Sequence, residues 1–295
     1  MNEIFTPGGR ARAAFVATAA AALAAGCGGS VVDDPGGTNA AVRLNCLGQA
    51  CIASDTLPTS RITAMLYVVD DGNRTQAQAG FNTDGSITHN VELEGDELDF
   101  VDGSRRTRMA LSLAGAFDFF GDLLTLGQPY LADVSPQPAA ARDYAFELVR
   151  ADGTLRSTVT LPAPFDIAAP SANARYPITT GTVPVTLTAP EPRNDLFATY
   201  TCVDSNGNQS TTSATATGGG AFSATDATGL HYAFSVPAML ATISFAGGSA
   251  PPGTVRSCNV TIHVVDTMPG LLAPGFHPFS IIEATQTRQV QITLD

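Results

Sequence analysis

Short apolar runs separated by turn sequences recur along most of this chain, and they constrain its fold more than any other feature. Within the runs, apolar and polar residues alternate, as in Val-Glu-Leu-Glu at residues 91–94. This is the period-2 pattern of a strand with one buried face. The separating sequences are turn formers, such as Asp-Asp-Gly-Asn at 70–73 and Asp-Gly at 152–153. Because no long segment has the period of an amphipathic helix, we expect an all-β protein.

The predicted strands fall into two series on either side of a proline-rich segment, Leu161-Pro-Ala-Pro-Phe165. The first series comprises 62–69, 76–81, 87–93, 98–101, 107–113, 144–149 and 155–161, and the second comprises 165–168, 183–188, 196–203, 230–236, 243–245, 255–265 and 289–294. Short strands at this spacing favour β-sandwiches, and the chain is long enough for two cores. We therefore predict two tandem sandwich domains, 61–162 and 163–295.

The second series resembles bacterial immunoglobulin-like domains. The resemblance rests on the opening Phe165-Asp-Ile-Ala-Ala-Pro170, the run Thr-Val-Pro-Val-Thr-Leu ending at Leu187, and the separation of Cys202 from Cys258. It implies an immunoglobulin-like sandwich over 163–295 and identifies no activity. The chain has no tryptophan, whereas antibody-type domains pack a tryptophan against their disulfide.

The N-terminus combines a basic start, a short apolar run and small residues before a cysteine. Arg10 and Arg12 precede the apolar run 13–23, and Ala-Ala-Gly leads to Cys27. This is the order of a secretory signal peptide, and the run is too short to span a bilayer as a helix. Because it ends in Leu-Ala-Ala-Gly-Cys, the segment 1–26 resembles a bacterial lipoprotein signal peptide.

That resemblance implies cleavage before Cys27, a diacylglyceryl group on the Cys27 thiol and an acyl chain such as palmitate on its new amine. Gly28 in place of an aspartate implies transfer to the outer membrane. Residues 27–60 are rich in Gly and Asp with little periodicity, which predicts a flexible tether. We thus expect a lipid-anchored protein of the cell envelope.

The cysteine count supports the same location. Of five cysteines, lipidation of Cys27 leaves four, which pair as a small loop between Cys46 and Cys51 and a long-range disulfide between Cys202 and Cys258. Disulfides are stable in an exported protein. A metal site is the weaker alternative, since there is no Cys-x-x-Cys and the four histidines are scattered.

The charge balance argues against anionic partners. The formal net charge is −12, and all 15 basic residues are arginine. Removing Glu3, Arg10 and Arg12 leaves 26 acidic and 13 basic groups, or −13 for the mature chain. Such a balance disfavours nucleic acid and basic-patch binding to anionic lipid.

Two polar segments have alternative interpretations. The acidic residues of 92–102 could bind Ca²⁺ through their carboxylate oxygens. Alternatively, they pair across strands with Arg105, Arg106 and Arg108, and we favour this second interpretation. The sequence Asp-Ser-Asn-Gly-Asn at 204–208 resembles the start of an EF-hand loop. It lacks the sixth-position glycine and the final glutamate, so we expect a hairpin turn.

No catalytic motif is present. His89, His231, His263 and His277 have no nucleophile or carboxylate at a spacing typical of a triad, and we find no nucleophile elbow or zinc-protease motif. We therefore expect no catalytic residues, metal or cofactor.

Two apolar stretches, 113–126 and 268–279, exceed what strand faces need. They either fold over a sandwich or form an exposed docking surface, and we favour the first. The predicted function is non-catalytic binding or scaffolding in the envelope, with an unknown protein or glycan partner. The alternatives are a carbohydrate-binding or adhesin-type module, which requires a row of exposed aromatic residues, and a secreted hydrolase.

Overall fold

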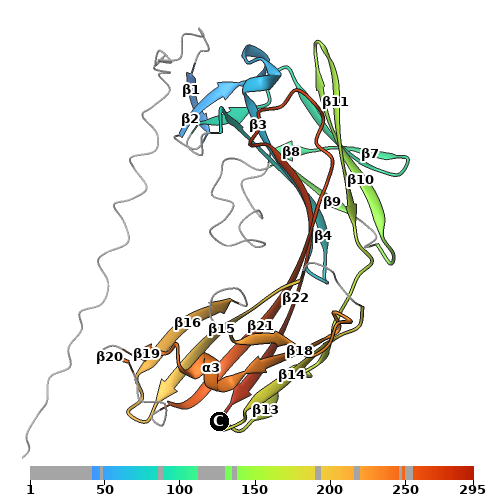
Figure 1. The fold of residues 1–295 in the computed structure, drawn as a ribbon. Coiled ribbons are helices and arrows are strands. Elements are labelled where there is room, and N and C mark those ends of the chain that lie inside the picture. The colour runs from blue at the N-terminus through green and yellow to red at the C-terminus, as the bar shows by residue number, and fades with distance from the viewer. Residues whose placement is uncertain are drawn as a thin grey trace, which may run out of the picture.

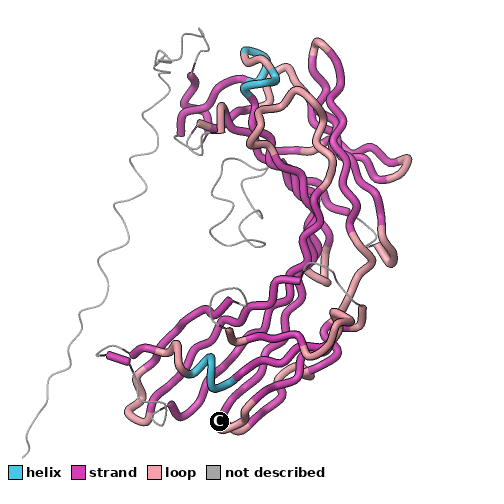
Figure 2. Tube along the Cα trace, viewed as in Figure 1, coloured by secondary structure: helices cyan, strands magenta, loops and turns pink. Residues whose placement is uncertain are grey.

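The protein is built almost entirely of strands (Figures 1 and 2). The computed structural model describes residues 42–46, 49–85, 89–111, 130–134, 138–189, 194–215, 220–245, 248–249 and 255–295. Helical structure within these ranges consists of α3 (Val236–Leu240) and two single 3-10 turns, η1 (Ser54–Thr56) and η2 (Thr59–Arg61). The all-β expectation is confirmed.

One large sheet, here called the shared sheet, runs through the whole described molecule. Its strands lie in the order β1 (Val42–Cys46), β2 (Gln49–Ala53), β5 (Asn90–Glu92), β4 (Thr75–Thr83), β3 (Ile62–Asp70), β22 (Ile281–Leu294), β21 (Val255–Pro269), β15 (Asn194–Asp204) and β16 (Gln209–Thr215). Three short strands join it: β9 (Tyr130–Val134) on β4, β8 (Ala110–Leu111) on β9, and β13 (Ala174–Tyr176) parallel to β22.

Two four-stranded sheets cover this sheet. The first covering sheet has the order β11 (Gly153–Leu161), β10 (Arg142–Arg150), β6 (Glu97–Asp102) and β7 (Arg105–Arg108). The second has the order β12 (Ile167–Ala169), β14 (Thr182–Leu187), β18 (His231–Ser235) and β17 (Phe222–Ala224). A small ribbon pairs β19 (Ser244–Phe245) with β20 (Gly248–Ser249). The predicted β-sandwich architecture is present in both halves.

Strand β22 belongs to both sandwiches. Its first half pairs in parallel with β3, its last residues pair with β13, and β21 accompanies it along most of its length. Its even-numbered residues are all buried: Ile282, Ala284, Gln286, Arg288, Val290, Ile292 and Leu294. Since alternate residues of a strand point to one face, both covering sheets lie on the same face of the shared sheet. Figure 1 shows β22 passing from one half into the other.

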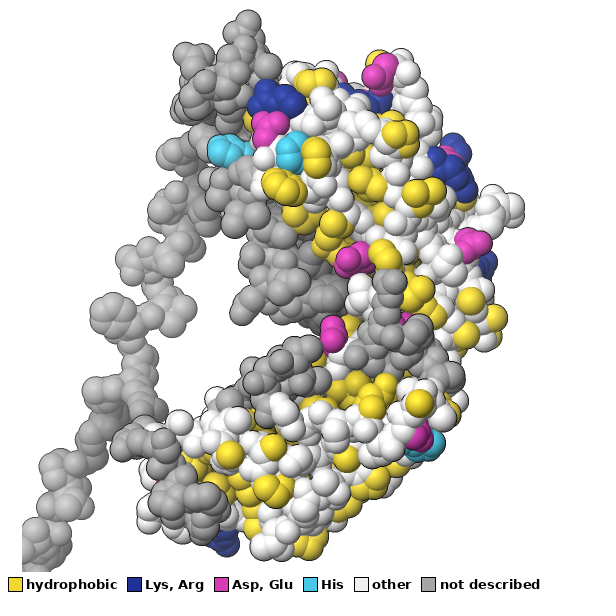
Figure 3. Space-filling view, in the orientation of Figure 1, with side chains coloured by type: hydrophobic (Ala, Val, Ile, Leu, Met, Phe, Trp, Pro, Cys, Tyr) yellow, Lys and Arg dark blue, Asp and Glu magenta, His cyan; other side chains and the backbone are white. Residues whose placement is uncertain are grey.

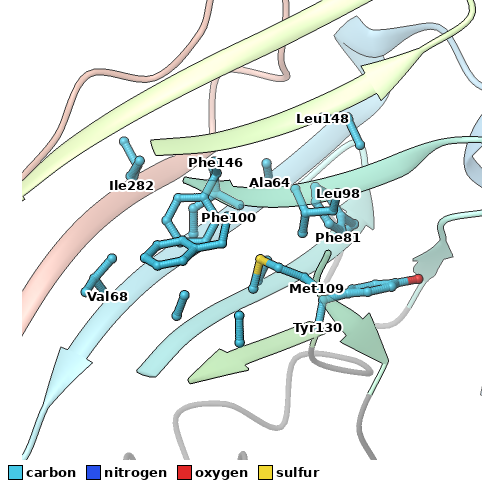
Figure 4. Close-up of a cluster of buried hydrophobic side chains, with 14 of the residues drawn as sticks. Ala64, Val68, Phe81, Leu98, Phe100, Met109, Tyr130, Phe146, Leu148 and Ile282 are labelled. Carbon is cyan, nitrogen blue, oxygen red and sulfur yellow. The ribbon is translucent and has the colours of Figure 1, made fainter. Parts of the chain in front are cut away.

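The first core lies between the shared sheet and the first covering sheet. Phe100 packs against Tyr144 and Phe146, with ring centroids 5.2 and 5.3 Å apart, and Figure 4 shows Ile282 at the edge of this cluster. Ile282 and Ala284 belong to this core, although the predicted ranges place them in the second domain.

The second core contains Phe165, Phe234, buried apolar residues of β14, β15 and β21, and the C-terminal part of β22 from Val290 to Leu294. Its cystine joins Cys202 to Cys258, which are directly paired residues of the neighbouring strands β15 and β21. The bond therefore lies within one sheet, whereas the immunoglobulin disulfide links two sheets.

The predicted tether is shorter than expected at its C-terminal end. Strand β2 pairs in parallel with β5, and Cys51, Ile52 and Leu57 are buried. The segment 51–60 is therefore part of the first sandwich and not of a linker. Residues 1–41, which include the predicted signal sequence and Cys27, lie outside the described residues. None of the described helices is long and apolar enough to cross a membrane.

Candidate functional site: a groove on the first covering sheet

A groove of about 650 Å³ lies on the outer face of the first covering sheet. Tyr144 and Phe146 point into the core, so the alternating residue Ala145 points to the opposite face. Ala145 and Val101 are register partners on β10 and β6, and both line the groove. Their small apolar side chains provide its floor, at a volume within the usual range for ligand sites.

One wall of the groove is built from the segment that follows β21. Leu271 and Thr158 exchange two backbone hydrogen bonds, with N···O distances of 2.9 and 2.7 Å, so the segment attaches to the free edge of β11. The Leu271 side chain is 75% exposed. Because Leu271 also lines the groove, its exposed side chain can contact a ligand bound there.

The apolar stretch 268–279 therefore divides between the two roles considered for it. Leu272 and Phe276 pack against the first core, which is the covering role. Leu271 and Phe279 are exposed, as a docking surface requires. The other apolar stretch, 113–126, lies outside the described residues.

A row of charged residues crosses the same outer face beside the groove. The register places Arg156, Glu147, Asp99 and Arg108 side by side on β11, β10, β6 and β7. Glu147 bonds Arg156 and Arg106, and Asp99 accepts from Arg108 Nε at 2.7 Å. The two acids are buried beneath arginines that stay half exposed.

The acidic stretch 92–102 thus contributes to ion pairs, as the cross-strand interpretation predicts. Asp96 lies 3.4 Å from Arg150, and Glu97 pairs with Arg108, whose hydrogen bond lowers the pKa of the Glu97 carboxyl. The described residues include no cluster of three or more His, Cys, Asp or Glu able to hold a metal ion. The other calcium candidate, at Asp204, is a hairpin turn: its carboxylate accepts from the backbone N–H of Asn206 and Asn208 at 2.8 Å.

The histidines make contacts, but two of them lack the order of a catalytic triad. His231 Nδ1 lies 2.6 Å from Asp226 Oδ2, and Thr228 bonds the same carboxylate rather than the imidazole. His263 lies 3.2 Å from the Thr199 hydroxyl, and burial lowers its pKa. Neither site joins a hydroxyl, an imidazole and a carboxylate in series, the arrangement of a Ser-His-Asp triad.

The remaining predicted site residues are cysteines and tyrosines. Cys51 is disulfide-bonded; the side chain of Cys46 lies outside the described residues, as does Cys27. The carbohydrate interpretation requires exposed aromatic residues, yet every one of the six tyrosines is buried or half-buried.

Sequence reasoning missed the groove because its wall depends on the pairing of Leu271 with Thr158, residues 113 positions apart with no shared motif.

Comparisons with known proteins give no family. No family model and no curated protein matches the sequence. Among solved structures, the chain is similar to CBD12 from CALX1.2 at 7% identity and a TM-score of 0.18, covering 77% of this chain and 99% of that one. It is also similar to the BSP domain of a biofilm associated protein at 7% identity and a TM-score of 0.17, covering 80% of this chain and 67% of that one. Scores this low carry no argument about function.

Proposed function

We propose that this chain is an exported, lipid-anchored protein of the cell envelope that binds a partner without catalysing a reaction. The observation that supports the binding role is the groove beside Leu271. Its described lining offers an apolar floor, the hydroxyls of Thr158 and Thr160, the guanidinium of Arg156 and the carboxylate of Asp143, which accepts from the Thr160 hydroxyl. That lining includes no histidine or cysteine, the residues most used as general bases and strong nucleophiles.

The groove also has a fixed position relative to the rest of the molecule. One wall continues from β21, which forms part of the second core, and the other belongs to the first covering sheet. A preformed site loses less conformational entropy when a ligand binds. This rigidity favours a binding or scaffolding role.

The binding role is tested by a photo-crosslinking amino acid placed at Thr160, in the groove, and separately at Thr154, near the exposed β10–β11 turn. Each full-length variant is expressed in its native cells and irradiated. We expect a discrete adduct from position 160 that disappears when Leu271→Arg is added, and none from position 154. Equal labelling at both positions, or no adduct at 160, would contradict the proposal.

The anchor is tested separately by the mass of the N-terminal tryptic peptide. With no lysine in the chain, this peptide runs from Cys27 to Arg43. A mass increased by a diacylglyceryl group and one further acyl chain supports the anchor. An unmodified peptide means a soluble exported protein, and leaves the binding role of the groove intact.

A further inference from the structure

The outer face of the second sandwich carries a regular array of uncharged polar side chains. Ala198, Tyr200, Ile262 and Ile292 point into the second core, so the alternating residues of the same strands point away from it. The array, here called the amide–hydroxyl face, consists of Thr211, Thr201, Asn259 and Thr293 in one row, Thr199, Thr261 and Gln291 in the next, and Phe197, His263 and Gln289 in the third.

This face carries no acidic or basic residue, although the chain as a whole has a net charge of −12. None of its ten residues is among the 42 acidic and basic residues of the sequence, which sum from 27 Asp and Glu and 15 Arg. Its first row ends at Arg175, and that arginine is paired with Asp295. The outer face of the first covering sheet, by contrast, carries the row of ion pairs. Most of the charged side chains visible in Figure 3 likewise lie over the upper half.

The face is held rigid from below and offers hydrogen-bonding groups above. The Cys202–Cys258 disulfide lies directly beneath the first row, next to Thr201 and Asn259 along their strands. Within the face, the Thr201 and Thr211 hydroxyls lie 3.2 Å apart, and Thr293 donates to Asn259 Oδ1 at 3.5 Å. Asn259 is exposed, as are Gln289 and Gln291, so their amide N–H groups are available to a ligand.

We propose that the amide–hydroxyl face binds a neutral glycan. Sugar hydroxyls both donate and accept hydrogen bonds, as do amides and threonine hydroxyls. The rings of Phe197 and His263 are half-buried and stacked 4.6 Å apart, and their exposed parts add an apolar contact for the C–H groups of a sugar. The net charge of −12 repels polyanions, and no cation on the face offsets that repulsion. This inference does not depend on the groove or on the lipid anchor.

The test is affinity electrophoresis of the full-length protein through gels containing dextran or mannan as neutral glycans, or alginate as an anionic one. We expect retardation by at least one neutral glycan and none by alginate. The double variant Asn259→Asp/Gln291→Glu keeps the side-chain shapes but replaces two amide donors with charges. It should weaken binding at least tenfold. Asn73→Asp, on an exposed turn of the first sandwich, should bind like the wild type.

Four outcomes would overturn the inference: no retardation by either neutral glycan, stronger retardation by alginate, equal losses in the double variant and in Asn73→Asp, or undiminished binding by the double variant. A dimer that dissociates in the double variant would assign the face to a second copy of the chain instead. Melting curves of both variants show whether a loss of binding reflects a loss of fold.

Discussion

Arg288 and Gln286 occupy the positions of β22 that lie between the two cores. Arg288 donates from Nη2 to Asp70 Oδ2 at 2.5 Å and from Nε to the Phe165 carbonyl at 2.8 Å. Gln286 Nε2 donates to the carbonyl of Pro162 at 2.7 Å. These two side chains therefore hold the proline-rich segment against the shared sheet. The sequence indicates a stiff connection there, but it does not reveal these partners, which lie more than 120 residues away.

Replacing Arg288 with methionine should destabilise the protein strongly. The substitution leaves Asp70 buried without its guanidinium, and removing one partner of a buried ion pair costs about 3–5 kcal/mol. Arg175→Met is the matched control, because Arg175 pairs with Asp295 at the surface and such pairs contribute about 0–1 kcal/mol. Urea denaturation measures both variants. If both variants lose the same unfolding free energy, the buried Arg288–Asp70 pair contributes no more than the exposed Arg175–Asp295 pair.

Asp266 is a residue whose replacement should stabilise the fold. It is fully buried on β21, and among the described residues neither of its carboxylate oxygens has a hydrogen-bond partner. Its register neighbour Gln286 also has an unpartnered Oε1. Asp266→Asn replaces a buried, unsatisfied carboxyl with an amide whose N–H can donate to that oxygen, so we expect a gain of about 1 kcal/mol in unfolding free energy. The exposed Asp195→Asn should change it by less than about 0.5 kcal/mol; a loss at Asp266 would contradict this account.

His263 should make the fold sensitive to acid. Burial lowers the pKa of its imidazole from 6.5, so the unfolded chain binds a proton more readily than the folded one does. The contribution to stability is complete above pH 6.5 and is lost as the pH falls through the folded-state pKa. His263→Gln should therefore lose less stability between pH 7 and pH 5 than the wild type, by urea midpoint. If the variant and the wild type lose the same stability between pH 7 and pH 5, His263 is not the source of the acid sensitivity.

At the scale of elements, the attachment of the segment after β21 depends on one glycine. A Cβ atom at Gly270 would lie 2.3 Å from the Thr158 carbonyl oxygen and 2.8 Å from Val159 Cβ. Gly270→Ala should therefore displace the Leu271 wall and cost about 1–3 kcal/mol, as overpacking does. Gly181→Ala is the control, since a Cβ there meets nothing within 4 Å. Unchanged stability and groove crosslinking in Gly270→Ala would refute the attachment.

Strands that are bounded by a turn sequence could be predicted from the amino-acid sequence. The turn sequence around Asp152 predicted the β10–β11 hairpin. The observed register pairs Arg150 with Gly153, so Ala151 and Asp152 form its tip, one residue earlier than the predicted Asp-Gly. The first half of β22 was missed. There Glu283, Thr285 and Gln286 interrupt the apolar pattern, and their environment comes from the parallel neighbour β3, more than 200 residues earlier. Long-range parallel pairing leaves no turn signal in a sequence.

At the scale of the whole molecule, the sequence predicts two sandwiches but not that they share a sheet. Separate domains in a chain normally meet through small polar interfaces and move relative to one another. Here backbone hydrogen bonds of β21 and β22 continue across the junction, and β22 contributes apolar residues to both cores. We therefore expect the two halves to unfold together as one cooperative unit.

Hydrogen exchange of the full-length protein in increasing urea tests this expectation most directly. Peptides covering β3 in the first sandwich and β15 in the second are followed by mass spectrometry. We predict that both lose protection at one urea concentration, and that Arg288→Met lowers that midpoint equally for both. Exchange of β3 at a concentration where β15 stays protected, or a shift confined to one half, would contradict the shared-sheet account.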